Sequence, residues 1–118
     1  MKVLFVEYPR CTTCKKAKKY LEDNNIEFID RHIVDENPSK EELKLWLDKS
    51  GLTINKFFNT SGKLYREMEL KDKVKTLPKE ELLNILSTNG MLVKRPIIVT
   101  EDTVLIGFKE DQWNEILK

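Results

Sequence analysis

The sequence predicts an α/β protein with one mixed β-sheet, formed by a β-α-β unit near the start of the chain and a β-β-α unit near its end. Strand-like runs rich in Val, Ile, Leu and Phe lie near the two ends. Between residues 39 and 90 the apolar residues recur with helical spacing. The two ends need each other to complete a sheet, so we expect one domain with helices inserted between its halves.

The β-α-β unit begins at the first apolar run. Residues 2–7 have the composition of a strand buried on both faces, and Pro9 ends the run because it has no N–H for a ladder. A helix is expected from Thr13, with apolar residues at helical spacing: Cys14, Ala17, Tyr20 and Leu21. Residues 26–30 are the next strand candidate. The two strands should therefore lie parallel, joined by a right-handed crossover.

Several helices are expected in the middle of the chain. Ser39 and Glu42 have the spacing of a capping box at a helix start, and a following glycine ends that helix. Shorter helices are expected over residues 54–58 and 64–68, and Pro78 begins a further helix rich in leucine.

The end of the chain returns to strands. Residues 96–99 and 103–108 are β-branched and lie on either side of an acidic turn, which predicts a hairpin. Residues 111–117 are expected to form a closing helix with three residues facing inward, namely Trp113, Ile116 and Leu117.

Composition excludes several classes of protein. The 118 residues include 21 Lys+Arg and 20 Asp+Glu, giving a net charge of +1, and 40% of them are hydrophobic. The apolar share is too high for a disordered chain, and the near-zero charge argues against a dedicated nucleic-acid-binding domain. No stretch is long and apolar enough to cross a membrane, and the first residues do not resemble a secretory signal. We therefore expect a cytoplasmic protein without direct nucleic-acid or membrane contacts.

The two cysteines form the motif Cys11-Thr12-Thr13-Cys14, where the first strand passes into the first helix. The first helical turn carries free N–H groups and a partial positive charge, both of which favour a thiolate. Residues 10–19 add five basic side chains and no acid. We therefore expect Cys11 to be a nucleophile with a lowered pKa. Cys14, within the first turn, is placed to resolve a mixed disulfide on Cys11.

Two other interpretations of the cysteine pair remain open. The pair could be half of a zinc site, which requires further Cys or His ligands, and His32 is the one histidine in the chain. It could also be a pair of inert core residues, because free cysteines are often buried.

A second candidate element precedes the third predicted strand. Pro96 opens that strand after a polar loop and is a candidate for a cis peptide bond. In a sheet of this order the loop lies beside the first βα turn, so Arg95 could reach an anion held by Cys11. Its rigid fork of donors suits oxyanions, although an exposed arginine in a turn is an equal alternative. Asn59 and its neighbours could line the same anion site or could simply form a turn.

Three segments together resemble one known family. They are residues 8–17, which include both cysteines, residues 94–99 with the Arg95-Pro96 pair, and Gly107-Phe108 before the final helix. In this order they are similar to the arsenate reductase (ArsC) and Spx family, over essentially the whole chain. The resemblance implies a thioredoxin-like fold in one domain, residues 1–118. Its thioredoxin-like parts would cover about 1–34 and 91–118, with a helical insertion over about 35–90 and a cis Pro96 facing the cysteine loop.

The enzymatic branch of this family implies an oxidoreductase. In glutaredoxin-linked arsenate reductases, the cysteine that matches Cys11 bonds arsenic and three arginines hold the oxyanion. Arg95 matches one arginine, but Asn59 occupies the second position and the third falls near Gly107. This departure argues against efficient arsenate reduction, because lysines do not replace a bidentate clamp. The expected anion site comprises Arg95 with Thr12, Thr13, Asn59 and Pro96.

The Spx branch implies a different function, a redox-sensing transcription regulator. Its members share the Cys11-x-x-Cys14 switch and Arg95, and they bind the C-terminal domain of the RNA polymerase α subunit. A glycine in their helical insertion matters for that contact, and Gly51 lies at a comparable place. Spx proteins continue into a basic tail, whereas this chain ends at Lys118. Other segments are more similar to a third group of bacterial ArsC-related proteins.

We therefore expect first a thiol–disulfide oxidoreductase, with Cys11 as nucleophile, Cys14 as resolving thiol and Arg95 as oxyanion ligand. Its substrate would be a small oxyanion or a thiol or disulfide. No cofactor would be bound, and glutathione with glutaredoxin, or thioredoxin, would be the reductant. The alternative is the Spx-like regulator that binds the RNA polymerase α subunit through a surface including Gly51. In either case we expect a monomer.

Overall fold

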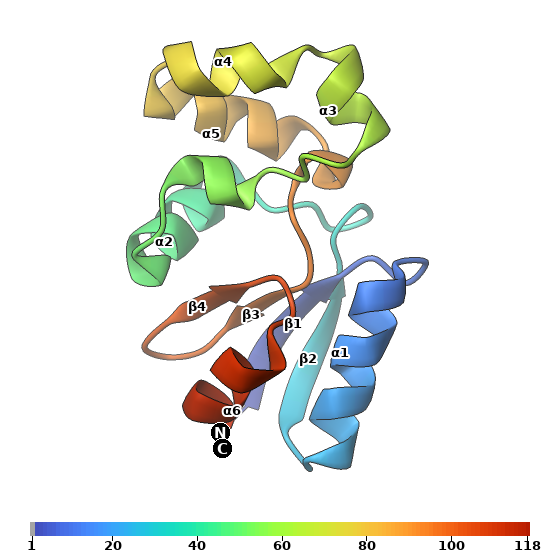
Figure 1. Ribbon diagram of the computed structural model, residues 1–118. Helices are drawn as coiled ribbons and strands as arrows, with labels where there is room; N and C mark the ends of the chain where they lie inside the picture. The colour runs from blue at the N-terminus through green and yellow to red at the C-terminus, as the bar shows by residue number, and fades with distance from the viewer. Residues whose placement is uncertain (1) are drawn as a thin grey trace.

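Strand β1 (Lys2–Glu7) lies inside a four-stranded sheet whose order is β2-β1-β3-β4 (Figure 1). The computed structural model describes residues 2–118, so Met1, at which the expected domain begins, lies outside the described residues. β1 pairs in parallel with β2 (Glu27–His32) and antiparallel with β3 (Ile97–Val99), which forms a hairpin with β4 (Val104–Ile106). The mixed sheet built from both ends of the chain is therefore confirmed.

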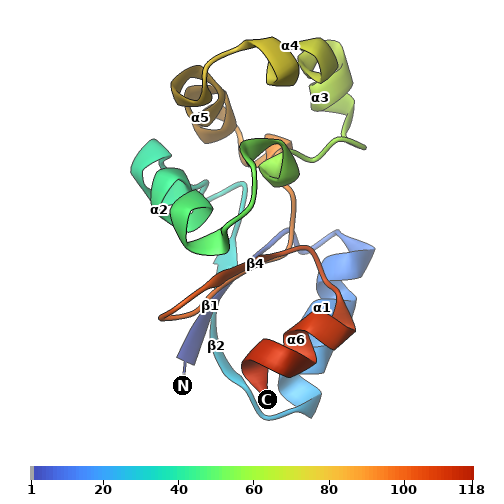
Figure 2. The ribbon, with the colours of Figure 1, turned by 60° about the vertical axis from the view of Figure 1, so that its left-hand side comes forward.

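Helices α1 (Thr12–Asp23) and α6 (Glu110–Leu117) cover one face of the sheet (Figure 2). Trp113 of α6 is fully buried there, and its indole N–H donates to the Gly107 carbonyl at 3.1 Å. The expectation that Ile116 also faces inward is wrong, because that side chain is 41% exposed. In a helix of only two turns the buried stripe is narrow, and Trp113 with Leu117 fills it.

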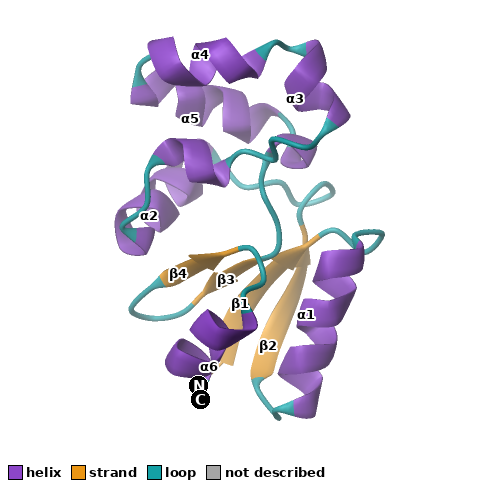
Figure 3. Ribbon diagram, viewed as in Figure 1, coloured by secondary structure: helices purple, strands orange, loops and turns teal. Residues whose placement is uncertain are grey.

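The other face of the sheet carries the helical insertion, by which we mean the segment from α2 to η2 (Figure 3). It contains two 3₁₀ turns and four α-helices, and its elements are α2 (Lys40–Ser50), η1 (Ile54–Phe57), α3 (Lys63–Glu67), α4 (Leu70–Thr76), α5 (Lys79–Thr88) and η2 (Gly90–Leu92). Sequence reasoning missed α4. Its fully buried residue is Leu70, so the helix has almost no apolar periodicity.

The insertion is joined to the sheet by polar and steric contacts. Arg31 of β2 donates to both carboxylate oxygens of Glu42 in α2, at 2.6 and 2.9 Å. The predicted capping box is present, because Ser39 and Glu42 exchange hydrogen bonds at the start of α2. Where the insertion ends, Gly90 packs so closely that a Cβ there would lie 1.9 Å from the Ile33 carbonyl oxygen. The chain thus leaves and re-enters the sheet region at nearly one point.

The helices are short. Within residues 2–118, none combines the length and the apolar character that crossing a lipid bilayer requires.

Candidate functional site

Cys11 lies at the junction of β1 and α1. The turn that follows β1 closes with a hydrogen bond from the Cys11 N–H to the Tyr8 carbonyl, at 2.9 Å. Cys11 is the N-cap of α1, and its Sγ accepts the backbone N–H of Cys14 at 3.4 Å. The Cys11 side chain is partly exposed, whereas Cys14 is buried against the core. The two sulfur-bearing residues therefore occupy one helical turn, one open to solvent and one closed.

The surroundings give the two thiols opposite acidities. Partial burial raises the pKa of Cys11, but hydrogen bonds from the Cys14 main chain and side chain, together with the Arg95 guanidinium, outweigh it and bring the pKa below the ordinary thiol value. Burial raises the pKa of Cys14 to about 12, and the neighbouring Cys11 and Glu7 add to the rise against the effect of the Tyr8 main chain. Cys11 is thus the more acidic of the two thiols, and Cys14 keeps its proton at neutral pH.

Arg95 reaches this junction from the loop before β3. The Arg95–Pro96 peptide bond is cis, as the sequence predicts, and the Pro96 carbonyl accepts the Gly107 N–H at 2.8 Å. The Arg95 guanidinium lies 5.1 Å from the centre of the Tyr8 ring and donates to the Met91 carbonyl at 3.5 Å. These contacts direct the arginine toward the cysteine turn.

Cys11 and Arg95 line a common cavity of about 190 Å³. Thr13 and Asn59, two of the expected anion-binding residues, line it as well. Asn59 is held there by its own N–H, which donates to the Leu92 carbonyl at 2.8 Å. The remaining lining residues are Phe58, Thr60, Ser61 and Lys94.

Three of the expected binding residues lie outside this cavity, as does the buried Cys14. Thr12 is exposed on the first turn of α1, and Pro96 is buried beneath the loop, so neither lines the cavity. Gly51 ends α2 in a left-handed conformation, with φ +70°, and is exposed on the insertion. The structure therefore brings together Cys11, Thr13, Asn59 and Arg95, and Gly51 belongs to another surface.

Sequence reasoning missed Glu7, an acid at the end of an apolar strand. It is 3% exposed and on the same face of β1 as Phe5, beneath α1. Its Oε2 lies 3.9 Å from Lys18 Nζ, which binds Asp30 of β2 at 2.9 Å. Burial and the neighbouring Asp30 raise the pKa of Glu7 to about 7, against the attraction of Lys18. The signal in the sequence was a charged residue inside a strand expected to be buried on both faces.

Over residues 2–118, no three His, Cys, Asp or Glu side chains come together in a group that could hold a metal ion.

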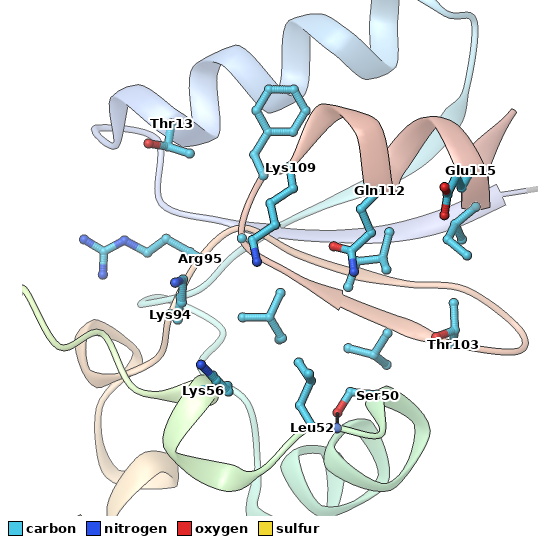
Figure 4. A pocket seen from close by; sticks show the side chains of 16 residues that line it. Thr13, Ser50, Leu52, Lys56, Lys94, Arg95, Thr103, Lys109, Gln112 and Glu115 are labelled. Carbon is cyan, nitrogen blue, oxygen red and sulfur yellow. Dashed lines mark hydrogen bonds between the residues drawn. The ribbon is translucent and has the colours of Figure 1, made fainter.

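A longer groove continues from the Cys11 cavity along β4 (Figure 4). Its volume is about 580 Å³, and it shares Thr13, Lys94 and Arg95 with the smaller cavity. The hairpin strand β4 lines the groove, between α6 on one side and the segment after α2 on the other. Sequence reasoning did not find this groove, because its lining residues come from four separate segments.

Comparisons with known proteins agree with this arrangement. A family model described as the ArsC family matches residues 6–116. The solved structure of an ArsC family related protein from Bacteroides fragilis is 55% identical, covers 98% of each chain and superposes with a TM-score of 0.95. The uncharacterized protein YusI of Bacillus subtilis is 50% identical over 98% of both chains. The global transcriptional regulator Spx 1 of Oceanobacillus iheyensis is 32% identical over 92% of this chain and 82% of its own. The thioredoxin-like fold with a helical insertion is thereby confirmed.

Proposed function

The chain belongs to the ArsC family, and from that premise we propose that it is a cytoplasmic thiol–disulfide oxidoreductase. Cys11 is the nucleophile, Cys14 the resolving thiol and Arg95 the ligand for the negative charge of the substrate. The observation that carries the proposal is the position of Cys11 Sγ. It accepts the Cys14 N–H at 3.4 Å at the start of a helix and opens into a cavity shared with Arg95.

The first step is attack by the Cys11 thiolate on one sulfur of a substrate disulfide. A new S–S bond forms between Cys11 and that sulfur, and the other sulfur leaves as a thiolate with the bonding electron pair. The positive charge of Arg95 and the N–H groups at the start of α1 stabilise the Cys11 thiolate before attack and a departing anion afterwards.

The second step is attack by Cys14 on the Cys11 sulfur. Cys14 loses its proton, forms an S–S bond with Cys11 and displaces the substrate sulfur as a thiolate, which takes up a proton. The substrate disulfide is thereby reduced by two electrons and the Cys11–Cys14 pair is oxidised. We propose that an external thiol, either glutathione with glutaredoxin or thioredoxin, then reduces the protein disulfide.

A disulfide substrate suits this site better than arsenate. Arg95 is the one arginine in the cavity, and the second arginine position of arsenate reductases carries Asn59. The third arginine position of those enzymes falls near Gly107, where even a Cβ atom would lie 3.3 Å from Lys94 Cε. One guanidinium with a flexible lysine can hold a single anionic group but cannot form a three-arginine cage.

The test uses dithiobis-nitrobenzoate, whose reduction releases coloured thionitrobenzoate. The wild-type protein should release two equivalents, one as Cys11 attacks and one as Cys14 resolves. Cys14→Ser should stop at one equivalent and keep the label on Cys11, as mass spectrometry of the digested protein would show. Cys11→Ser should lose the fast phase. A Cys11→Ser protein that reacts as fast as wild type refutes the assignment of the nucleophile.

A second candidate function is favoured by the relative named a global transcriptional regulator. Under this alternative the Cys11–Cys14 disulfide is a switch, and the insertion surface at Gly51 contacts the C-terminal domain of the RNA polymerase α subunit. Gly51 is exposed, with no atom within 4 Å of a Cβ placed on it, so a partner has room to approach. The purified protein, reduced or oxidised, should then bind that domain, and Gly51→Arg should abolish binding.

A further inference from the structure

The groove beside the cysteine turn is asymmetric in charge (Figure 4). Four basic residues gather toward the end that contains Thr13, namely Lys56, Lys94, Arg95 and Lys109. Glu115 is the acid that lines the groove, and it lies toward the opposite end. None of the four basic side chains forms an ion pair with an acid within residues 2–118. This local excess of positive charge occurs in a chain whose net charge is only +1.

Away from the basic end, the groove also has exposed apolar side chains among its polar ones. Leu52 and Ile116 line it, and they are 42% and 41% exposed, although both are large hydrophobic residues. β4 contributes buried aliphatic residues, Val104 to Ile106, to the same surface. A ligand that fills the groove would therefore present negative charge near Thr13 and apolar groups near Leu52.

The groove and the Cys11 cavity are continuous, because Thr13, Lys94 and Arg95 line both. The groove volume of about 580 Å³ lies within the usual range for bound organic ligands, whereas the cavity of about 190 Å³ at Cys11 holds only a small group. A ligand that extends along the groove would thus place one of its sulfur atoms at Cys11.

We propose that this groove selects peptide disulfides that carry acidic residues next to the reacting cysteine. The inference rests on the proposed function and names the class of substrate for it. The substrate cysteine enters the cavity at Cys11 and its acidic neighbours lie against Lys56, Lys94 and Lys109. An adjoining apolar residue of the substrate covers Leu52 and Ile116.

The experiment compares two peptides of equal length, each with one cysteine in a mixed disulfide with thionitrobenzoate. One has two glutamates beside the cysteine and the other has two lysines. Cys11 attack forms a bond to the peptide sulfur and releases thionitrobenzoate, so the colour reports the rate. The wild-type protein should react roughly tenfold faster with the acidic peptide at low salt, and the preference should shrink as salt screens the charges.

The groove lysines provide the decisive variants. Lys56→Gln and Lys109→Gln should each lower the rate with the acidic peptide about threefold, the size expected for one exposed ion pair. Lys75→Gln, an exposed lysine on α4, is the matched control and should leave both rates unchanged. Equal rates for both peptides, or an equal loss in Lys75→Gln, overturn the groove proposal while leaving the proposed function intact. If neither peptide labels Cys11, the proposed function itself fails.

A second inference rests on a different observation, the buried carboxylate of Glu7. Cys14 and Lys18 are four residues apart in α1 and so lie on the same side of the helix. Lys18 Nζ is 3.9 Å from Glu7 Oε2, and the Glu7 carboxylate is close enough to Cys14 to help raise the pKa of that thiol. The charged and titratable groups around Glu7 are Lys18 and Cys14 on α1, and Asp30 and His32 on β2.

From this placement we infer that Glu7 accepts the proton that Cys14 loses when it attacks the mixed disulfide on Cys11. The resolving thiol is buried and keeps its proton at neutral pH, so the second step needs a nearby base. Burial beside Asp30 raises the pKa of Glu7 to about 7, which makes its carboxylate a base of suitable strength. Lys18 can hold the proton-accepting oxygen in place through its bridge to Asp30.

The second release of thionitrobenzoate isolates this step. In the wild-type protein its rate should rise with pH through about 7, as Glu7 becomes a carboxylate. Glu7→Gln should slow the second release on the order of a hundredfold and remove that inflection, while the first release persists. Glu7→Asp should recover part of the rate, and Glu22→Gln, an exposed acid on α1, should have no effect. A second release in Glu7→Gln with the wild-type rate and pH profile overturns the inference.

Discussion

Arg95 and Tyr8 form a cation–π contact, with the guanidinium carbon 5.1 Å from the centre of the ring. The Tyr8 carbonyl also accepts the Cys11 N–H. The same tyrosine therefore fixes both the turn that presents the sulfur and the arginine that faces it. Cation–π contacts of partly buried groups contribute about 1 kcal/mol, which favours this orientation of the arginine side chain. The distance between the cation and the thiolate is thereby set by the fold.

Removing the Arg95 charge should weaken the Cys11 thiolate. Arg95→Gln should raise the pKa of Cys11 toward the ordinary thiol value, because the guanidinium is one of the groups that lower it. Loss of about 1 kcal/mol of interaction should slow alkylation of Cys11 at pH 7 by roughly fivefold. The pH dependence of thiolate absorbance measures the shift. Arg66→Gln, an exposed arginine on α3, is the control, and an unchanged titration in Arg95→Gln would contradict the prediction.

Glu7 should make stability fall as pH rises. Its folded pKa of about 7 lies above the value of 4.5 for an exposed glutamate, so its contribution to stability is fully present below pH 4.5 and is lost as the pH rises through 7. Glu7→Gln removes the buried charge, and at pH 8 the variant should be more stable than wild type by about 2 kcal/mol. Urea unfolding at pH 5 and pH 8 measures this difference. A difference that stays constant between the two pH values would show that Glu7 ionises normally.

Glu42 should make stability fall as the pH is lowered, the opposite of the effect of Glu7. The Arg31 guanidinium lowers the pKa of Glu42 to about 2, so its stabilising effect is present above 4.5 and is lost as the pH falls toward 2. Glu42→Gln keeps the capping hydrogen bond but loses the ion pair, and should cost about 1–2 kcal/mol at pH 7. Thermal unfolding of this variant beside Glu41→Gln, whose side chain is exposed, tests the prediction. Equal stability of the two variants would mean that the Arg31 bridge contributes nothing.

Gly90 should tolerate no side chain. A Cβ at this position would lie 1.9 Å from the main-chain oxygen of Ile33, which cannot move without shifting the end of the insertion. Gly90→Ala should therefore destabilise the protein by about 3 kcal/mol. Gly51→Ala meets no atom but has a φ of +70°, so it should cost only about 1 kcal/mol. Denaturant titration of the two variants gives the free energy of unfolding of each and so separates steric overlap from backbone strain. Similar losses of unfolding free energy in the two variants would refute the steric explanation.

Local chemistry made much of this fold predictable. The apolar run before Pro9, the capping box at Ser39 and the hairpin signals around the acidic turn each fix an element through nearby residues. The cysteine turn followed from the same reasoning, because the N-cap position and its free N–H groups depend on a few neighbouring residues.

Features that depend on distant contacts were not predictable. The environment of Glu7 arises only when Asp30 and Lys18 fold against it, and periodicity alone does not separate a buried acid from one at a strand end. Ile116 belongs to the apolar pattern of its helix but lines a groove completed by the segment after α2. Short helices such as α4 are fixed by the packing of one residue and leave little pattern in the sequence.

Because Ile33 and Gly90 are packed against each other, the two ends of the insertion lie close together beside the sheet. The free energy of closing a loop increases only slowly with the number of residues in it. A turn of helix can therefore be gained or lost within the insertion without altering the spacing of the two sulfurs. The turn that carries Cys11 and Cys14 then depends on β1 and α1, whereas the insertion supplies Phe58 to Ser61 to the cavity at Cys11. A chimera that exchanges only residues 40–92 with a relative should therefore keep the spacing of Cys11 and Cys14 and acquire a new lining for the cavity at Cys11.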